Sequence, residues 1–258
     1  MSRRAAEDAI SSGRVKVNRE PASLGQQVSV GDDVNIDGWF YVVDEVFNRP
    51  KVYAYHKPDG EVCTANDPEG RKTVFTALPR LNGTRWVMVG RLDINTQGLL
   101  LFTTDGELAN RLMHPSSEVE RVYNVRVRGQ VGEDVLQALS QGVELEDGVA
   151  AFTTLSWPQG EVESYNRWFT VGIKEGRNRE VRRMWESQGL EVSRLIRRAY
   201  GEVVMPKGLH RGKGMFLDDK IVDSLCKSVG YSVESQLVLR DARKRPTKSK
   251  QEGRRSRR

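Results

Sequence analysis

Apolar and polar residues alternate strictly over residues 121–128 of the chain. Val125 and Val127 fall on one side of an extended segment together with Tyr123, while Arg126 falls on the other side. This two-residue period is typical of a strand with one face in a core and the other in solvent. The segment is therefore predicted to be a half-buried strand that carries Tyr123 on its apolar face.

Other segments follow a helical period or form short apolar runs. In residues 179–187, Val181 and Met184 lie on one face of a predicted helix. Two further helices are predicted at 106–113 and 133–140. Apolar runs bounded by glycine or proline predict strands at 52–55, 86–90, 99–103, 149–155 and 168–174. Strands and short helices in this irregular order predict an α+β fold with a mixed or antiparallel sheet.

The first 48 residues have a different pattern and predict a small separate module. A helix over residues 3–11 is followed by short apolar pieces, which are separated by turns that contain Gly and Asp. A linker is expected to end near Asn48. We therefore expect one module over residues 1–48 and a larger domain over residues 49–235, which fits a length of 258 residues.

Charge distinguishes the last segment from the rest of the chain. The 41 Lys and Arg residues outnumber the 35 Asp and Glu residues, and the net charge is +6. Residues 241–258 hold nine cationic and two acidic residues, so the remainder has a net charge of −1. Because apolar residues are scarce here, residues 236–258 are predicted to be a disordered basic tail. Such a tail suits RNA, although a basic run can also serve only solubility.

Several classes of protein are disfavoured by what the sequence lacks. No stretch approaches the roughly 18 consecutive apolar residues of a membrane span, and the N-terminus shows no apolar core of a secretory signal. We expect a cytoplasmic protein without a membrane partner. Cys63 and Cys226 form no C-x-x-C pair and the three histidines are far apart. This spacing argues against a disulfide framework, and no metal site is predicted.

The segment Gly90-Arg91-Leu92-Asp93 is the first candidate for chemistry. Arg91 and Asp93 stand two residues apart, so in extended geometry both side chains leave the same face and can address one site. A carboxylate beside a guanidinium stays ionised, as a nucleophile or proton acceptor must. For these four residues alone, a turn aspartate that caps a loop is the simpler explanation.

Residues 174–198 form the second candidate, with eight cationic and four acidic residues. Focused positive charge can hold phosphates. Glu180 and Glu186 could instead pair with Arg183 and Arg182, which lie about one helical turn away. The pattern alone leaves both interpretations open.

Five motifs in order resemble those of the RsuA-type pseudouridine synthases. The sequence GRLDINTQGL at 90–99 resembles the family signature GRLDxx[TS]xGL. Similar family motifs are found at Lys57-Pro58, at 120–123, at 176–184 and at 192–201. Residues 99–116 are especially similar to the RluB branch, which acts on 23S ribosomal RNA. Residues 2–18 resemble the later part of an S4 RNA-binding domain, so that this module is expected to be truncated at its start.

The resemblance implies the isomerisation of uridine to pseudouridine by base flipping and breakage of the glycosidic bond, without a cofactor. Asp93 would be the catalytic carboxylate, either adding to C1′ or abstracting the C2′ proton. Arg182 would pair with Asp93 and keep it ionised and oriented. Tyr123 would stack on the flipped base and assist proton removal from C5, and Leu195 would form the floor of the pocket.

The resemblance also implies contacts to RNA and a set of partners. Arg91 would contact the displaced RNA or its phosphates, and Lys57, Arg177 and Arg197 are weaker candidates for the same electrostatic role. The expected partner is 23S rRNA or a pre-50S ribosomal particle, bound by a monomer. Two other hypotheses are kept: a non-catalytic RNA-binding factor for ribosome assembly, and a carboxylate-metal nuclease.

Overall fold

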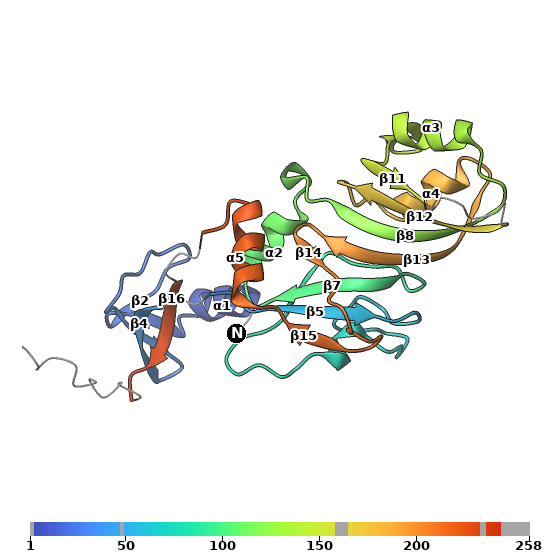
Figure 1. Cartoon of the computed structure of the whole chain (residues 1–258). Helices are drawn as coiled ribbons and strands as arrows, with labels where there is room; N and C mark the ends of the chain where they lie inside the picture. The colour runs from blue at the N-terminus through green and yellow to red at the C-terminus, as the bar shows by residue number, and fades with distance from the viewer. Residues whose placement is uncertain (1–2, 47–48, 158–164, 233–235, 244–258) are drawn as a thin grey trace, which may run out of the picture. The chain divides into compact units, whose positions relative to one another are not determined.

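The protein folds into two compact units in the computed structural model (Figure 1). The structure describes residues 3–46, 49–157, 165–232 and 236–243. Unit 1 consists of Met1–Arg49 and Val233–Arg258, and unit 2 of Pro50–Ser232. No helix in these described ranges has the length and apolar character needed to cross a bilayer.

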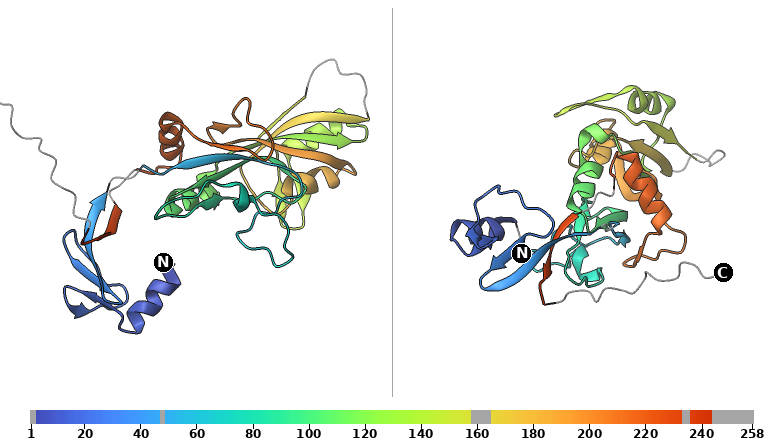
Figure 2. Two further views of the ribbon diagram at one scale, coloured as in Figure 1. Left: turned by 90° about the horizontal axis from the view of Figure 1, so that it is seen from below. Right: turned by 90° about the vertical axis from the view of Figure 1, so that its left-hand side faces the viewer.

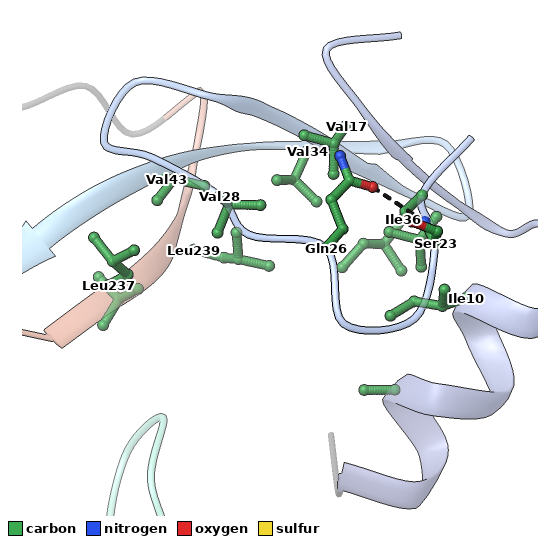
Figure 3. A pocket seen from close by; sticks show the side chains of 14 residues that line it. Ile10, Val17, Ser23, Gln26, Val28, Val34, Ile36, Val43, Leu237 and Leu239 are labelled. Carbon is green, nitrogen blue, oxygen red and sulfur yellow. Dashed lines mark hydrogen bonds between the residues drawn. The ribbon is translucent and has the colours of Figure 1, made fainter. Parts of the chain in front are cut away.

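Unit 1 is a small antiparallel sheet with one helix. The helix α1 spans Arg3–Ser11, and the strands are β1 (Val15–Val17), β2 (Glu20–Pro21), β3 (Asp33–Ile36), β4 (Trp39–Val46) and β16 (Gln236–Asp241). The strand order is β16-β4-β3-β1-β2. Ala9 of α1 and Val43 of β4 are buried in its small core. An apolar cavity of about 270 Å³ also lies in this unit, lined by residues such as Ile10, Val28 and Leu239 (Figure 3).

Strand β16 corrects the predicted extent of the tail. Residues 236–241 pair with β4 in antiparallel register, with Val238 opposite Asp44 and Asp241 opposite Tyr41. In Figures 1 and 2 the red strand β16 lies beside the blue strand β4, although the two are far apart in sequence. The prediction of a disordered tail from residue 236 is therefore wrong for 236–241, because β4 offers this segment a backbone hydrogen-bonding partner. Residues 244–258 lie outside the described part of the chain.

Unit 2 is built on a nine-stranded mixed sheet. Its main path is β11-β12-β8-β13-β7-β5-β15, with β14 paired to β13 and β6 paired to β7. The pairing of β13 with β7 is parallel and the other pairings in this sheet are antiparallel. The α+β fold with a mixed sheet is thus confirmed. The strands are β5 (Val52–Lys57), β6 (Val87–Val89), β7 (Gln97–Thr103), β8 (Arg121–Arg128), β11 (Thr154–Ser156), β12 (Asn166–Ile173), β13 (Glu191–Tyr200), β14 (Val203–Val204) and β15 (Gly214–Phe216).

Helices cover both faces of this sheet. They are α2 (Gly106–Met113), α3 (Glu133–Gln141), α4 (Glu180–Glu186) and α5 (Asp219–Ser228), with short 3-10 turns at Val74–Ala77 and Pro115–Ser117. The Asp105 side chain caps α2 by accepting a hydrogen bond from the Leu108 amide. The predicted strand at 149–155 is wrong as a single strand. It is divided between β10 (Gly148–Ala150), which pairs with β9 (Val143–Leu145), and β11, which joins the main sheet.

The alternation of side chains along β7 defines two faces of the sheet. Leu99 and Leu101 pack with α2 and α5 in one core cluster, and we call this side the back face. Leu100 and Phe102 pack in another cluster on the front face. Tyr123 packs against that front cluster and also against the cluster under α3 and α4. The half-buried strand predicted at 121–128 is therefore confirmed as β8, with Tyr123 on its apolar side.

Candidate active site

The loop between β6 and β7 carries the candidate carboxylate. Leu92 is buried in the front cluster, whereas Arg91 is exposed and Asp93 is half-buried. This alternation places Arg91 and Asp93 away from the core, as the sequence predicts for two residues that address one site. The loop is closed by a hydrogen bond from the Thr96 amide to the Asp93 carbonyl at 3.0 Å.

Lys57, at the end of β5, holds this loop by hydrogen bonds to its backbone. It is fully buried, and its Nζ donates to the carbonyls of Pro58 at 3.1 Å, Ile94 at 3.2 Å and Thr96 at 2.9 Å. Burial lowers the pKa of Lys57, and nearby acidic groups including Asp93 oppose that shift. A buried ammonium is stable only when its donors are satisfied, and the three carbonyls fulfil that need. The predicted contact of Lys57 with RNA does not fit this position, because the amine is enclosed by the backbone that follows Asp93.

Arg182 of α4 holds the next part of the loop. It is 5% exposed, and it donates to the Asn95 carbonyl at 3.0 Å and to the Val192 carbonyl at 2.8 Å. Burial and then the nearby Arg179 charge lower the pKa of Arg182, while the Asp93 charge raises it. The Nε of Arg182 is buried and has no hydrogen-bond partner among the described residues.

Arg182 and Asp93 do not form the predicted ion pair in this structure. No ion pair within 4.0 Å joins these two described residues, so Arg182 binds the loop backbone two residues beyond the carboxylate. Its charge is nevertheless close enough for Asp93 to affect its pKa. In this structure Arg182 contacts the backbone of the loop that carries Asp93.

Arg197 of β13 supports the first residues of β7. It is 3% exposed and its Nε donates to the Leu99 carbonyl at 2.7 Å. It also lies over the Tyr200 ring, 5.1 Å from the centroid. Its Nη2 is buried and has no hydrogen-bond partner among the described residues. The RNA contact predicted for Arg197 stays a prediction.

Gly98 allows β7 to approach β13 closely. It pairs with Arg197 in the parallel register and has φ +113°. A Cβ atom at this position would lie 2.3 Å from the Arg197 carbonyl oxygen and 2.5 Å from its nitrogen. Only glycine fits both the backbone angle and the space.

Tyr123 and Leu195 lie beside the loop on the front face. Tyr123 is directly opposite Arg197 in the β8–β13 pairing, and Leu195 is opposite Val125. Tyr123 is half-buried and packs against the clusters that contain Leu92 and Leu195. The sheet register thus brings Tyr123 and Leu195 to the side of the sheet that bears Asp93.

Arg177 lies in a different environment from the one predicted. Its guanidinium donates to carbonyls of the β9–β10 hairpin at Gly148, 3.1 Å away, and Val149, 2.8 Å away, and its Nε donates to Glu175 at 2.6 Å. These bonds commit Arg177 to the protein, which does not fit a role in binding RNA. Other cations of this segment also have carboxylate partners: Lys174 pairs with Glu118, Arg179 with Glu186, and Arg183 with Asp147.

Some polar groups near the site have no counterpart in the sequence prediction. Cys63 accepts a hydrogen bond from the Leu92 amide at 3.4 Å, and burial raises the pKa of its thiol. Thr96 and Gln97 each carry a buried side-chain oxygen without a partner in the described residues. Thr96 and Gln97 lie inside the recognised GRLD motif, so motif position was the one signal that could have pointed to them.

The arrangement supplies a carboxylate on a fixed loop, an aromatic ring beside it and an exposed arginine two residues away. The carboxylate-metal nuclease hypothesis requires several converging ligands. In the described ranges, no three His, Cys, Asp or Glu side chains are grouped so that they could hold a metal ion. The site itself therefore lends that hypothesis no support.

Comparison with known proteins gives the family of the chain. Residues 51–187 match the family model described as RNA pseudouridylate synthase, and residues 2–34 match that of the S4 domain. The chain belongs to the RNA pseudouridylate synthase family. This assignment confirms the predicted resemblance and the S4-like character of the N-terminal module.

Several members of the family are similar over most of the chain. The chain is 54% identical to "Ribosomal large subunit pseudouridine synthase B" of Yersinia pestis, over 95% of this chain and 78% of that protein. The protein of the same name from Escherichia coli K12 is 58% identical, over 84% of this chain and 75% of that protein. The one from Haemophilus influenzae is 52% identical, over 95% and 70%.

A solved structure shows the same fold. The protein titled "Crystal structure of pseudouridylate synthase" matches with a TM-score of 0.60 and 26% identity, and covers 87% of this chain and 94% of that chain. Family membership makes the chain an RNA pseudouridine synthase and places its chemistry in the unit that carries Asp93.

Proposed function

We propose that this chain isomerises uridine to pseudouridine in 23S ribosomal RNA, with Asp93 as the catalytic carboxylate. The relatives named for the large ribosomal subunit support the substrate. The observation that carries the catalytic role is the Asp93 loop, whose backbone is held by two buried cations, Lys57 and Arg182. A loop fixed in this way presents its carboxylate without further reorganisation.

The reaction breaks the bond between N1 and C1′ and forms one between C5 and C1′. The target base must first leave its stack, which costs a few kcal/mol that contacts in the pocket have to offset. Asp93 either adds to C1′ as the base departs or removes the C2′ proton to give a glycal. In both routes the detached base then rotates so that C5 faces C1′. In the first route the C5–C1′ bond forms as the ester bond between Asp93 and C1′ breaks, and in the second the C2′ proton returns from Asp93 as C5 adds to C1′.

The C5 proton leaves last and N1 gains a proton, so product and substrate are isomers. Tyr123 stacks on the flipped base and assists proton removal from C5. Leu195 provides an apolar floor to the pocket. Arg91 is exposed and without a side-chain partner in the described residues, so its charge is available to the RNA backbone.

We further expect the protein to act in the cytoplasm as a monomer, on 23S rRNA or on a pre-50S particle. Removal of the Asp93 carboxylate distinguishes this catalytic function from the alternative of a non-catalytic assembly factor. That alternative needs RNA binding but has no use for an ionised carboxylate on a fixed loop.

The test compares the wild type with Asp93→Asn and with Asp59→Asn as a control. Asp59 is an exposed carboxylate near the same site, since its charge affects the pKa values of Lys57 and Arg182. Each protein is incubated with unmodified 23S rRNA, and pseudouridine is mapped by carbodiimide labelling and primer extension. We expect one new stop with the wild type and with Asp59→Asn, and none with Asp93→Asn. A stop that persists in Asp93→Asn would overturn the role of Asp93, and no stop with the wild type on rRNA or pre-50S particles would favour the assembly factor.

A further inference from the structure

The back face of the unit 2 sheet carries a group of cations that the proposed reaction does not use. Lys57 and His56 are neighbours on β5 and point to opposite faces. Lys57 bonds to the Asp93 loop on the front, whereas the Nδ1 of His56 lies 2.8 Å from the Leu209 carbonyl. His56 pairs with Leu99, which belongs to the back-face core. His56 therefore marks the side of the sheet that faces away from Asp93.

The segment between β14 and β15 brings further cations to His56. The Gly212 amide donates to the His56 carbonyl at 2.8 Å, and the His56 amide donates to the Lys213 carbonyl at 2.9 Å. Figure 1 shows this orange segment crossing β7 and β5. The glycine-rich sequence here lacks the spacing of a nucleotide-binding loop, and it forms an irregular connection that presents His210, Arg211 and Lys213 to solvent.

Strand β13 adds Arg198 to the same place. The Met205 amide donates to the Arg198 carbonyl at 2.7 Å, which continues the antiparallel pairing of β13 with β14. Met205 belongs to the back-face core, so Arg198 opposite it lies on the same side of the sheet. Burial lowers the pKa of His56, and the charges of Arg211, Arg198 and His210 lower it further against an opposing hydrogen bond to Leu209. The cations thus surround one histidine. We call His56, Arg198, His210, Arg211 and Lys213 the back-face cluster.

The charge of the back-face cluster is not neutralised by the protein. Arg198, His210, Arg211 and Lys213 are exposed, and none of them has an ion-pair partner within 4.0 Å in the ranges that the structure describes. By contrast, the cations around α4 are paired with carboxylates such as Asp147 and Glu175. Arg194 is also exposed and lies opposite Arg126 in the register with β8. The free positive charge therefore extends along β13.

We propose that the back-face cluster binds the phosphate backbone of the RNA substrate outside the target nucleotide, on the face of the sheet opposite Asp93. This inference rests on the proposed function, in which the substrate is a large folded RNA. Exposed cations that come from strand β13 and from a loop match a run of phosphates better than a single small anion. Contacts of this type position an RNA helix and carry no sequence information.

The test uses a triple variant and a matched control. The variant Arg198→Gln/Arg211→Gln/Lys213→Gln removes three charges of the back-face cluster and leaves His56 and the Asp93 site intact. The control Lys51→Gln/Lys220→Gln/Lys227→Gln removes three other exposed charges of unit 2. Binding is measured by filter retention at several salt concentrations with a long fragment of 23S rRNA. Conversion is measured separately with a short hairpin that holds the target uridine.

We expect the back-face triple variant to bind the long fragment on the order of tenfold more weakly, and the slope of log K against log salt to fall by about 2. The hairpin should be converted at the wild-type rate, and the control should behave as the wild type in both assays. Unchanged binding of the long RNA by the triple variant, or an equal loss in the control, would overturn the proposal. Absence of conversion by the wild type would instead contradict the proposed function, because binding is measured independently.

Discussion

Arg182 and Arg183 are adjacent in helix α4 and have opposite surroundings. Arg182 is 5% exposed and donates to the carbonyls of Asn95 and Val192. The Arg183 side chain is 24% exposed and forms a two-pronged ion pair with Asp147, at 2.8 and 2.9 Å. One arginine fixes the loop that carries Asp93, and the other fixes the turn of the β9–β10 hairpin.

The difference shows that the local density of arginine does not identify the residues that serve the site. Cations at the Asp93 loop satisfy backbone carbonyls in a buried environment, where an unpaired polar group costs most. Cations at the hairpin satisfy carboxylates near solvent, where ion pairs contribute little. The comparison predicts that equal substitutions will have unequal effects in the two regions.

The largest effect on stability is expected from Lys57→Met. The substitution removes three hydrogen bonds and leaves the carbonyls of Pro58, Ile94 and Thr96 buried without a donor, which should cost about 4 kcal/mol of unfolding free energy. Urea unfolding measures this cost, with the exposed Lys51→Met as a control that should change stability by less than about 0.5 kcal/mol. Equal stability of the two variants would show that Lys57 does not hold the loop.

A slightly smaller loss is expected from Gly98→Ala. The added Cβ would collide with the Arg197 backbone and impose a positive φ on alanine, so that β7 and β13 must separate at a cost of about 3 kcal/mol. Gly176→Ala is a suitable control, because nothing lies within 4 Å of its Cβ position. If Gly98→Ala unfolds at the same urea concentration as the control, the close parallel pairing of β7 with β13 is not needed for stability.

A modest effect is expected from Arg177→Met in the hairpin region. The side chain is 22% exposed, so water can replace its bonds to the Gly148 and Val149 carbonyls. We expect a loss of about 1 kcal/mol and conversion of RNA within about twofold of the wild type. A loss of stability as large as that of Lys57→Met would remove the distinction between the two regions.

The smallest effect concerns the pH dependence of the Asp147 pair. Hydrogen bonds from Arg183 and then Arg177 lower the pKa of Asp147 from 3.8 to about 2. A lowered carboxyl pKa gives stability that is present above pH 3.8 and is lost as the pH falls from 3.8 towards about 2. The melting temperatures of the wild type and Asp147→Asn should therefore differ slightly near neutral pH and converge in acid. A difference that persists unchanged at the acid end would contradict this pairing.

Much of the fold could be predicted because its pattern is local. The alternation around Val125 predicted strand β8, and the apolar period around Met184 predicted helix α4. The pairing of β16 with β4 could not be predicted in this way, because its partner lies at the other end of the chain. Strand β16 lies at the edge of a small sheet, and Leu237 is about half exposed. Its apolar pattern is therefore too weak to predict a strand next to a basic run of residues.

For the candidate site, the motifs predicted which residues lie near Asp93 more reliably than they predicted the role of each residue. Tyr123 and Leu195 lie on the front face of the sheet, beside the loop that carries Asp93. The burial of Lys57 and Arg197 was not visible, since charged residues at strand ends are usually exposed. Their partners are backbone carbonyls, which leave no mark in the sequence, so the sequence alone favoured a role in RNA binding.

The most direct test of the account compares Arg182→Lys with Arg183→Lys in single-turnover conversion of the same rRNA fragment. Both variants keep the charge, but lysine cannot donate to the Asn95 and Val192 carbonyls together from one planar group. We expect Arg182→Lys to react on the order of 100-fold more slowly while binding RNA normally, because the Asp93 loop is misplaced. We expect Arg183→Lys to react within about twofold of the wild type. Equal rates for the two variants would contradict the claim that buried cations position Asp93 through the backbone of its loop.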